Sequence, residues 1–349
     1  MRLLFVSPCT DEEHYGGVQL TARLALDGFQ RNVEVKTLCY GARCVRKEEY
    51  PGRACSKSKG GAALGALRLR KQADRIVFWH LDLLKLLPFL GKDGAAKYLF
   101  LHGIECWRPM TGFRARLLDG VDMFLTNSQF TWDRFIAINP RWKHAAHRVT
   151  PLGVGMPESR LAPPGPAPAA VMIGRMDGGE DYKGHRELIE AWPRVLEQVS
   201  NAELWIVGGG DGAAGLKRLA ASGPAAGHIR FTGVIPEAEK QNLLRQSRCM
   251  ALPSRGEGFG LVYLEAMRLG RPCLASVHDA GREVICPPRA GFAVEPRDTE
   301  SVAAALVRLL TPGPEWQELS ASARERYESC FTAAHFQARL RDAVLERAA

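Results

Sequence analysis

Short apolar runs that alternate with helical or irregular segments recur along all 349 residues of the chain. This alternation is typical of α/β domains in which helices cover both faces of a parallel sheet. In the first half we expect strands near 2–7, 33–38, 76–79, 97–101, 122–126 and 148–151. In the second half we expect strands near 169–174, 203–207, 229–232, 248–252, 272–275 and 291–294. The pattern predicts two doubly wound domains, with functional side chains at the carboxyl ends of the strands.

The segment from Pro157 to Pro168 divides the two series of strands. It contains Pro163-Pro164-Gly165-Pro166 and has no apolar periodicity, which favours an interdomain linker. We therefore predict an N-terminal domain, a linker and a C-terminal domain at residues 1–157, 158–168 and 169–328.

A glycine-rich turn with two carboxylates eight residues apart lies in Leu252–Ala266. We expect Gly258, Phe259, Gly260 and Leu261 to open a helix whose amides and positive dipole end suit a diphosphate. Glu265 would then lie about 6 Å along the helix, near enough to reach a ribose joined to that phosphate. Glu257 precedes the turn, where it could contact sugar hydroxyls. The alternative is an ordinary loop whose glycines permit a tight turn.

Two cations follow an earlier strand, within Val171–His185. Arg175 comes directly after the strand, and Lys183 precedes a periodic segment from about Arg186 to Val199. Arginine binds an anion as a planar fork and lysine as a point charge. Each residue alone is more simply a solvated surface cation. Together with the glycine-rich turn, they indicate a site for one phosphate group.

With these motifs the chain resembles the retaining nucleotide-sugar glycosyltransferases of glycosyltransferase family 4, which have the GT-B architecture. The resemblance rests on Gly16-Gly17, His102-Gly103, Asn127-Ser128, Gly174-Arg175, Lys183-Gly184, Val207–Gly210, Phe231–Gly233 and Glu257–Glu265. It implies an acceptor-binding domain and a donor-binding domain, both Rossmann-like, that face a central cleft. It also implies that the last helical segment, in 329–349, crosses back to pack on the N-terminal domain.

The resemblance implies a role for each residue of the motifs. His102, Glu257, Arg175 and Lys183 would be catalytic, the two cations by neutralising the diphosphate of the leaving nucleotide. One well-placed donor of this kind contributes roughly 3 kcal/mol. The donor-binding set would be Gly16, Gly17, Arg175, Lys183, Gly209, Gly233, Val234, Ile235, Gly258, Phe259, Gly260, Leu261 and Glu265. Within it, Glu265 would hold the ribose, Gly233 to Ile235 would bracket the base, and Gly16 and Gly17 would let the backbone approach the phosphates.

The expected chemistry is front-face substitution, with the leaving phosphate accepting the acceptor's proton. Glu257 would contact the donor sugar and Glu265 the ribose, so they are not a glycosidase pair, which must flank one bond. His102 would contact the donor sugar, and the alternative for it is a loop histidine that caps the next element.

A dinucleotide-dependent oxidoreductase is a weaker interpretation. Val207–Gly212 is a loose dinucleotide fingerprint, but a dehydrogenase of this kind needs an acid at the end of the next strand. The relevant strands end in Thr37–Tyr40 and Phe231–Val234, which contain no acid. Two alternatives stay open: a nucleotide-sugar epimerase of the same architecture, and a non-catalytic nucleotide- or glycan-binding protein.

The positive charge of the chain is concentrated in its first half. Residues 1–157 hold 24 Lys and Arg against 14 Asp and Glu, and the remainder holds 23 against 24. Such a surface suits anionic lipid headgroups or an anionic acceptor, and a solvated basic face is the alternative. No motif supports nucleic acid binding. The cluster comprises Arg43, Arg46, Lys47, Arg53, Lys57, Lys59, Arg68, Arg70, Lys71 and Arg75, around an apolar and basic helix expected at Ala62–Ala73.

The sequence lacks three features that would indicate a membrane-spanning, secreted or disulfide-rich protein. No run approaches the roughly 18 apolar residues of a membrane helix, and the first apolar run is too short for a signal peptide. Nine cysteines without a Cys-x-x-Cys pair favour reduced thiols. His144 and His147 have no nearby acid and look like a basic helix face or loop, so we expect no metal site, no cofactor beyond the nucleotide sugar, and metal-independent catalysis.

The prediction is a cytoplasmic enzyme, peripheral on the inner face of the cytoplasmic membrane. It would transfer a sugar with retention from a UDP- or GDP-sugar to a glycan or lipid-linked acceptor. The pathway expected is cell-surface polysaccharide or lipopolysaccharide biosynthesis.

Overall fold

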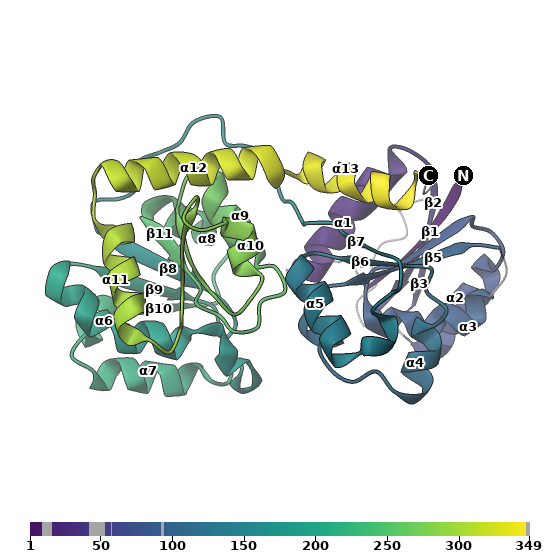
Figure 1. Cartoon of the computed structure of the whole chain (residues 1–349), viewed down its shortest axis with the longest axis horizontal. Coiled ribbons are helices and arrows are strands. Elements are labelled where there is room, and N and C mark those ends of the chain that lie inside the picture. The colour runs from purple at the N-terminus through teal and green to yellow at the C-terminus, as the bar shows by residue number, and fades with distance from the viewer. Residues whose placement is uncertain (9–15, 42–52, 57, 92–93, 347–349) are drawn as a thin grey trace. The chain divides into compact units, whose positions relative to one another are not determined.

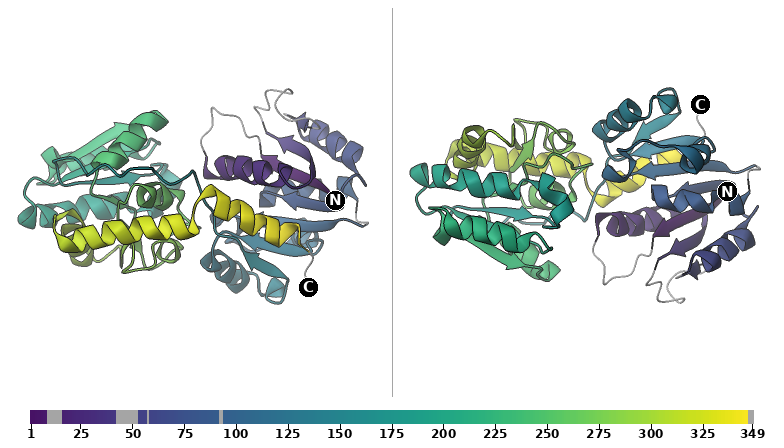
Figure 2. Two further views of the ribbon diagram at one scale, coloured as in Figure 1. Left: turned by 90° about the horizontal axis from the view of Figure 1, so that it is seen from above. Right: turned by 90° about the horizontal axis from the view of Figure 1, so that it is seen from below.

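The computed structural model describes residues 1–8, 16–41, 53–56, 58–91 and 94–346. The chain forms two compact units, Met1–Val154 with Ala333–Ala349, and Gly155–Thr332. Each unit has a parallel sheet with helices on both faces (Figures 1 and 2). The predicted fold class, two Rossmann-like doubly wound domains, is confirmed. Within the described residues, no helix combines the length and apolarity that a bilayer crossing requires.

The described part of the first unit contains a seven-stranded sheet in the order β3-β2-β1-β4-β5-β6-β7. The order reverses between β1 and β4, which is where doubly wound sheets bind ligands. Leu3 to Val6 of β1 are all buried, because helices cover both faces of the sheet. The strands are β1 Arg2–Pro8, β2 Glu34–Tyr40, β3 Arg53–Ser56, β4 Arg75–Phe78, β5 Ala96–Leu101, β6 Met123–Thr126 and β7 His147–Val149.

The helices of this unit connect the strands and include several short 3-10 turns. They are α1 Gly17–Gln30, α2 Lys59–Leu69, η1 Leu81–Leu86, α3 Leu87–Leu90, η2 Ile104–Cys106, α4 Gly112–Leu118, α5 Gln129–Ile138 and η3 Pro140–Trp142. The helix expected at Ala62–Ala73 is instead α2. It begins earlier because Ser58 caps it by accepting from the amide of Gly61. It ends at Leu69, and Lys71 then takes a positive φ of 61°.

The last helix, α13 (Ala333–Val344), belongs to the first unit. Phe336 is fully buried and its ring lies 6.1 Å from that of Trp79. The side-chain amide of Gln337 donates to the carbonyl of Leu24 on α1 at 2.9 Å. A Cβ on Gly28 of α1 would lie 2.8 Å from Gln337, so this glycine permits close packing of α1 and α13. The predicted return of the C-terminal helix to the N-terminal domain is confirmed.

The second unit contains a six-stranded sheet, within the described residues, in the order β10-β9-β8-β11-β12-β13. Its order reverses between β8 and β11. The strands are β8 Ala169–Ile173, β9 Glu203–Val207, β10 Ile229–Gly233, β11 Cys249–Ala251, β12 Cys273–Ser276 and β13 Gly291–Val294. The helices are η4 Gly178–Lys183, α6 His185–Gln198, α7 Ala213–Ser222, η5 Ala226–His228, α8 Glu237–Gln246, α9 Leu261–Arg268, α10 Gly281–Ile285, α11 Thr299–Leu310 and α12 Pro314–Cys330.

The segment expected to be a linker, 158–168, is bound to the second unit. Glu158 pairs with Arg245 at 3.0 Å and with Arg268 at 2.6 Å. Arg271 is 2% exposed, and burial lowers its pKa to about 10. Its guanidinium donates to the carbonyl of Ala162 at 2.9 Å and to those of Leu244, Arg245 and Leu269. These carbonyls, rather than an acid, compensate the buried charge.

Candidate functional site

The loops that follow β8 and β9 pack against each other by backbone contact. The amide of Gly174 donates to Val207 O at 3.0 Å, and that of Met176 donates to Gly209 O at 2.8 Å. Gly208 has a φ of 137°, and a Cβ there would lie 2.0 Å from Gly174 O. A residue with a side chain would break this contact. Gly208 therefore positions the loop that carries Arg175.

The segment that carries Lys183 packs in the same way on the loop after β11. The amide of Arg255 donates to Tyr182 O at 2.8 Å. A Cβ on Gly184, whose φ is 91°, would lie 2.5 Å from the carbonyl oxygen of Pro253. A Cβ on Gly256 would lie 2.7 Å from the ring of Tyr182. The two glycines let these distant segments meet.

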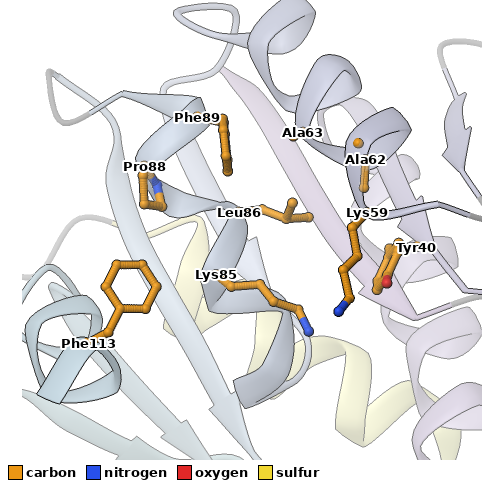
Figure 3. A pocket seen from close by; sticks show the side chains of 10 residues that line it. Tyr40, Lys59, Ala62, Ala63, Lys85, Leu86, Pro88, Phe89 and Phe113 are labelled. Carbon is orange, nitrogen blue, oxygen red and sulfur yellow. The ribbon is translucent and has the colours of Figure 1, made fainter. Parts of the chain in front are cut away.

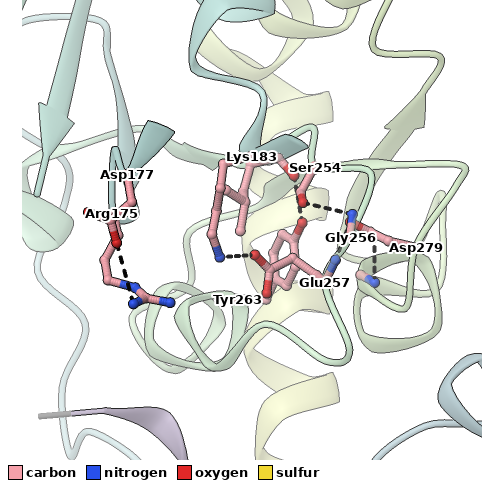
Figure 4. A network of polar contacts seen from close by, with 10 residues as sticks. Arg175, Asp177, Lys183, Ser254, Gly256, Glu257, Tyr263 and Asp279 are labelled. Carbon is pink, nitrogen blue, oxygen red and sulfur yellow. Dashed lines mark hydrogen bonds and ion pairs between the residues drawn. The ribbon is translucent and has the colours of Figure 1, made fainter. Parts of the chain in front are cut away.

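Lys183 and Glu257 form an ion pair at this junction. Lys183 Nζ lies 2.6 Å from Glu257 Oε1, and the side chains are 15% and 14% exposed (Figure 4). Both side chains are largely removed from water, so their mutual attraction offsets part of the cost of burying the two charges. The structure thus brings together two residues for which the sequence predicted separate contacts, one with phosphate and one with sugar.

Arg175 is the more exposed of the two predicted cations. Its side chain is 70% exposed, and its guanidinium lies 3.5 Å from Asp177. In Figure 4 the side chains of Arg175 and Lys183 extend from their loops toward the same side of the view. Binding of both to one phosphate stays a prediction.

Helix α9 begins at Leu261, whereas the sequence analysis expected Gly258 to open it. Gly260 is the N-cap, with a left-handed φ of 84°. A Cβ there would lie 2.5 Å from the Tyr263 ring, so a side chain would be strained and crowded. The side chain of Phe259 is buried, 6.0 Å from the ring of Phe331. At Phe259 only the backbone can face a ligand.

A buried carboxyl group, Asp279, supports the turn before α9. Its oxygens accept from the amides of Glu257 at 3.4 Å and Gly281 at 2.9 Å. The amide of Ala280 in turn donates to Glu257 O at 3.1 Å. Burial and the nearby Glu257 carboxylate raise the pKa of Asp279 well above its usual value, which favours the neutral acid. In Figure 4, Asp279 lies beside Gly256 and Glu257.

Glu265 lies on α9 and pairs with Lys240 on α8. Lys240 Nζ lies 2.8 Å from Glu265 and 2.9 Å from Glu237. The side chain of Glu265 is 13% exposed, and burial raises its pKa while Lys240 opposes the shift. Burial lowers the pKa of Lys240, but the two carboxylates outweigh it and leave the pKa raised. Sequence reasoning did not find Lys240, and its spacing of three residues from Glu237 on one helix is the only local signal.

The residues expected to bracket the base follow β10. Val234 is 84% exposed, although it is a large apolar residue. A Cβ on Gly209 would lie 2.9 Å from Val234 Cγ2, so the loops after β9 and β10 lie side by side. Gly233 has a positive φ of 72°, and Ile235 is partly buried. Their contact with a base stays a prediction.

In the first unit, His102 follows β5 and is held by three hydrogen bonds. Its Nε2 donates to the carbonyl of Trp79 at 2.7 Å, since a carbonyl can only accept. Its amide donates to Glu105 at 2.5 Å, and its carbonyl accepts from the side chain of Asn127 at 2.7 Å. Burial lowers the pKa of His102 to about 4. The ring is therefore neutral near pH 7, with Nδ1 as its acceptor, and its contact with a sugar stays a prediction.

The other predicted residues of the first unit lie at the start of α1. Gly16 is the extended N-cap and Gly17 the first helical residue. A Cβ on Gly16 would lie 2.2 Å from the side-chain oxygen of Gln19. Of the basic cluster, Arg43, Arg46, Lys47 and Lys57 lie outside the described residues, as does the side chain of Arg53.

The described residues include no group of three or more His, Cys, Asp or Glu side chains that could hold a metal ion. The interpretation of His144 and His147 as a basic helix face or loop holds for His144, which lies in a turn, and is wrong for His147. His147 lies in strand β7, and its ring stacks on Trp132 at 4.1 Å.

Comparison with known proteins identifies the family. Residues 167–312 match the family model described as Glycosyl transferases group 1. A phosphatidyl-myo-inositol mannosyltransferase of Mycolicibacterium smegmatis is 37% identical over 141 residues, which are 40% of this chain and 35% of that protein. The chain thus matches about a third of the length of that relative.

A longer match covers both units. A GDP-mannose-dependent alpha-(1-6)-phosphatidylinositol monomannoside mannosyltransferase of Mycobacterium tuberculosis is 30% identical over 264 residues, 69% of this chain and 67% of that protein. The crystal structure of Anabaena HepE in complex with UDP superposes with a TM-score of 0.77 at 15% identity, over 98% of this chain and 99% of that one, which supports the GT-B fold. The predicted family is confirmed: the chain belongs to the group 1 glycosyl transferases.

Proposed function

We propose that the protein transfers a sugar from a nucleoside diphosphate sugar to a lipid-linked acceptor in the assembly of a cell-surface glycoconjugate. The observation that carries this proposal is the Lys183–Glu257 ion pair beside the N-terminus of α9. A cation, an acid and the N-terminus of a helix, close together at the loops after the strands, suit a pyrophosphate joined to a sugar. The names of the relatives favour GDP-mannose as donor and a phosphoinositide as the model acceptor.

The roles of the side chains follow from their positions. As the bond between the anomeric carbon and the phosphate breaks, negative charge grows on the leaving phosphate. Lys183, Arg175 and the amides at the start of α9 stabilise that charge. Glu257 holds donor-sugar hydroxyls, and Glu265, positioned by its ion pair with Lys240, holds the ribose.

The proposed transfer retains the configuration of the sugar. The acceptor hydroxyl attacks the anomeric carbon on the face that the phosphate leaves, and its proton passes to a phosphate oxygen. Neutral His102 can accept a hydrogen bond from the donor sugar at Nδ1. Arg175 and Lys183 supply the positive charge, so the reaction needs no metal ion.

The proposed setting is the inner face of the cytoplasmic membrane, because the acceptor is a lipid and α2 carries exposed cations. Polysaccharide or lipopolysaccharide assembly is the proposed pathway class.

Thermal unfolding with a panel of nucleoside diphosphates and their sugars tests the donor assignment. A ligand at a hundred times its dissociation constant adds about 2.7 kcal/mol of stability, and we expect the largest shift with GDP or GDP-mannose. Incubation of GDP-mannose with phosphatidylinositol vesicles should then yield an α-linked mannolipid. An unchanged midpoint with every nucleotide would contradict the donor site, and epimerised sugar formed without acceptor would favour the epimerase.

A further inference from the structure

A cavity of about 540 Å³ lies in the first unit. It is formed where α2, η1, α3 and the start of α4 meet beyond the end of β2 (Figure 3). Its volume is within the range of small-molecule sites, roughly 300–1,000 Å³. Its place at the carboxyl edge of the sheet is where doubly wound domains bind ligands.

The walls of the cavity are almost wholly apolar. Two of the aromatic side chains are exposed although they are large, Phe113 by 60% and Phe89 by 39%. Exposed apolar surface of this kind marks binding sites. The apolar and aromatic wall residues include Tyr40, Ala62, Ala63, Leu86, Phe89 and Phe113.

Two cations stand at one end of this apolar space. Figure 3 shows the ammonium groups of Lys59 and Lys85 directed into the region beside Tyr40. Lys85 Nζ lies 5.7 Å from the centre of the Tyr40 ring. None of the described residues that line the cavity is acidic. An apolar chamber that ends in two ammonium groups matches a molecule with a hydrocarbon chain and an anionic group.

The outer face of α2 continues this combination of apolar and basic groups. Leu64 and Leu67 are 49% and 47% exposed, and Arg68, Arg70 and Lys71 are exposed beside them. Leucines on a short helix, with cations on it and directly after it, favour contact with the boundary between headgroups and acyl chains of an anionic membrane. The same helix lines the cavity with Lys59, Ala62 and Ala63.

We propose that this cavity binds one hydrocarbon chain of an anionic membrane phospholipid, with Lys59 and Lys85 on its phosphate. The lipid anchors the first unit to the bilayer. None of the residues proposed to bind the donor lines this cavity.

The test distinguishes the contribution of the lipid's hydrocarbon chain to binding from that of its charged headgroup. Lys59→Ala/Lys85→Ala removes both cations, and Ala63→Trp fills the cavity without changing charge. Lys143→Ala/Lys217→Ala is a matched control, because both lysines are exposed and lie outside the cavity. Binding is measured by co-sedimentation with vesicles of phosphatidylcholine containing phosphatidylglycerol, and by calorimetry with monomeric dihexanoyl phosphatidylglycerol.

The first double variant should bind both lipids about 30-fold more weakly, since each cation near an anionic surface contributes about fivefold. Ala63→Trp should weaken binding about tenfold, equivalent to the loss of about two buried methylene groups. The control should bind like the parent protein. Stabilisation by GDP, measured in parallel, reports that each variant is folded.

Two results would overturn the proposal. The first is unaltered binding by Ala63→Trp while Lys59→Ala/Lys85→Ala binds weakly, which would leave a purely electrostatic surface. The second is equal binding of the parent protein to vesicles with and without phosphatidylglycerol. Loss of GDP binding with retained lipid binding would instead remove the proposed function and leave the lipid site intact.

Discussion

Lys183 Nζ lies 2.6 Å from Glu257 Oε1, although the two residues are 74 positions apart in the chain. The pair joins the lysine that was predicted to bind phosphate to the glutamate that was predicted to contact the donor sugar. In the protein without donor, each charge satisfies the other in a mostly desolvated setting. A donor that carries both a pyrophosphate and a sugar can contact both members, so the pair is arranged for a ligand in which these groups are adjacent.

Replacement of Lys183 by Ala should weaken GDP-mannose binding about 100-fold, equivalent to about 2.7 kcal/mol, because a charge-assisted contact with phosphate is lost. It also leaves Glu257 unpaired. Calorimetric titration measures the effect. Arg186→Ala is the control, since that side chain is 51% exposed and pairs with Glu190. Equal affinities for the two variants would remove Lys183 from the donor site.

Glu265→Ala should weaken GDP binding about 30-fold and leave the affinity for 2′,3′-dideoxy-GDP unchanged, because only the ribose contact is lost. Lys240→Met should produce the same selective loss, since it leaves the Glu265 carboxylate buried without its cation. Lys240→Arg retains the charge and should restore much of the affinity. A loss of equal size for both nucleotides would show that Glu265 does not contact the ribose.

The neutral state of His102 predicts a pH dependence of stability. Its pKa is about 4 in the folded protein and about 6.5 in the unfolded chain. As the pH falls from 6.5 to 4, the unfolded chain binds the proton first, so the contribution of His102 to stability is full above 6.5 and is lost on acidification. The loss is up to about 3 kcal/mol.

Urea unfolding of the parent protein and His102→Gln at pH 7.5 and 4.5 isolates this term, because other groups contribute to both proteins. We expect the parent protein to lose more stability than the variant between these conditions. An identical loss in the two proteins would contradict a buried, neutral His102.

The proposed function assigns the positive charge at the leaving phosphate to Arg175 and Lys183, so removal of divalent metal with EDTA should leave the rate of sugar transfer unchanged. The measurement is the initial rate before and after chelation, with added Mg²⁺ or Mn²⁺ as the comparison. A loss of rate that either ion restores would mean that a cation bridges the donor phosphates.

Much of the fold can be predicted from this sequence because buried parallel strands are continuous apolar runs. The strand β3 is not predicted, since Arg53–Ser56 contains no such run. The start of α9 is also not predicted correctly. Gly260 is the N-cap, so the helix begins at Leu261, about one turn later than the glycine-rich sequence suggests. A side chain at Gly260 would also meet the ring of Tyr263, a contact that the sequence alone does not reveal.

The sequence indicates which residues belong to the candidate site, but it does not indicate which other side chains those residues contact. Glycine motifs and strand ends indicate Arg175, Lys183, Glu257 and Glu265, because strand-end loops carry function in this architecture. Lys240 and Asp279 are tertiary partners from other elements, and no local periodicity reveals them. Asp279 stands out in the sequence only as an acid two residues before a glycine, Gly281.

The guanidinium of Arg271 has a practical consequence for anyone who isolates the donor half. One of its acceptors, the carbonyl of Ala162, precedes β8. A fragment that begins at β8 lacks Ala162, so the buried guanidinium of Arg271 would lose one of its carbonyl acceptors. A fragment that starts at Gly155 retains every carbonyl that accepts from Arg271 and should be the more stable of the two.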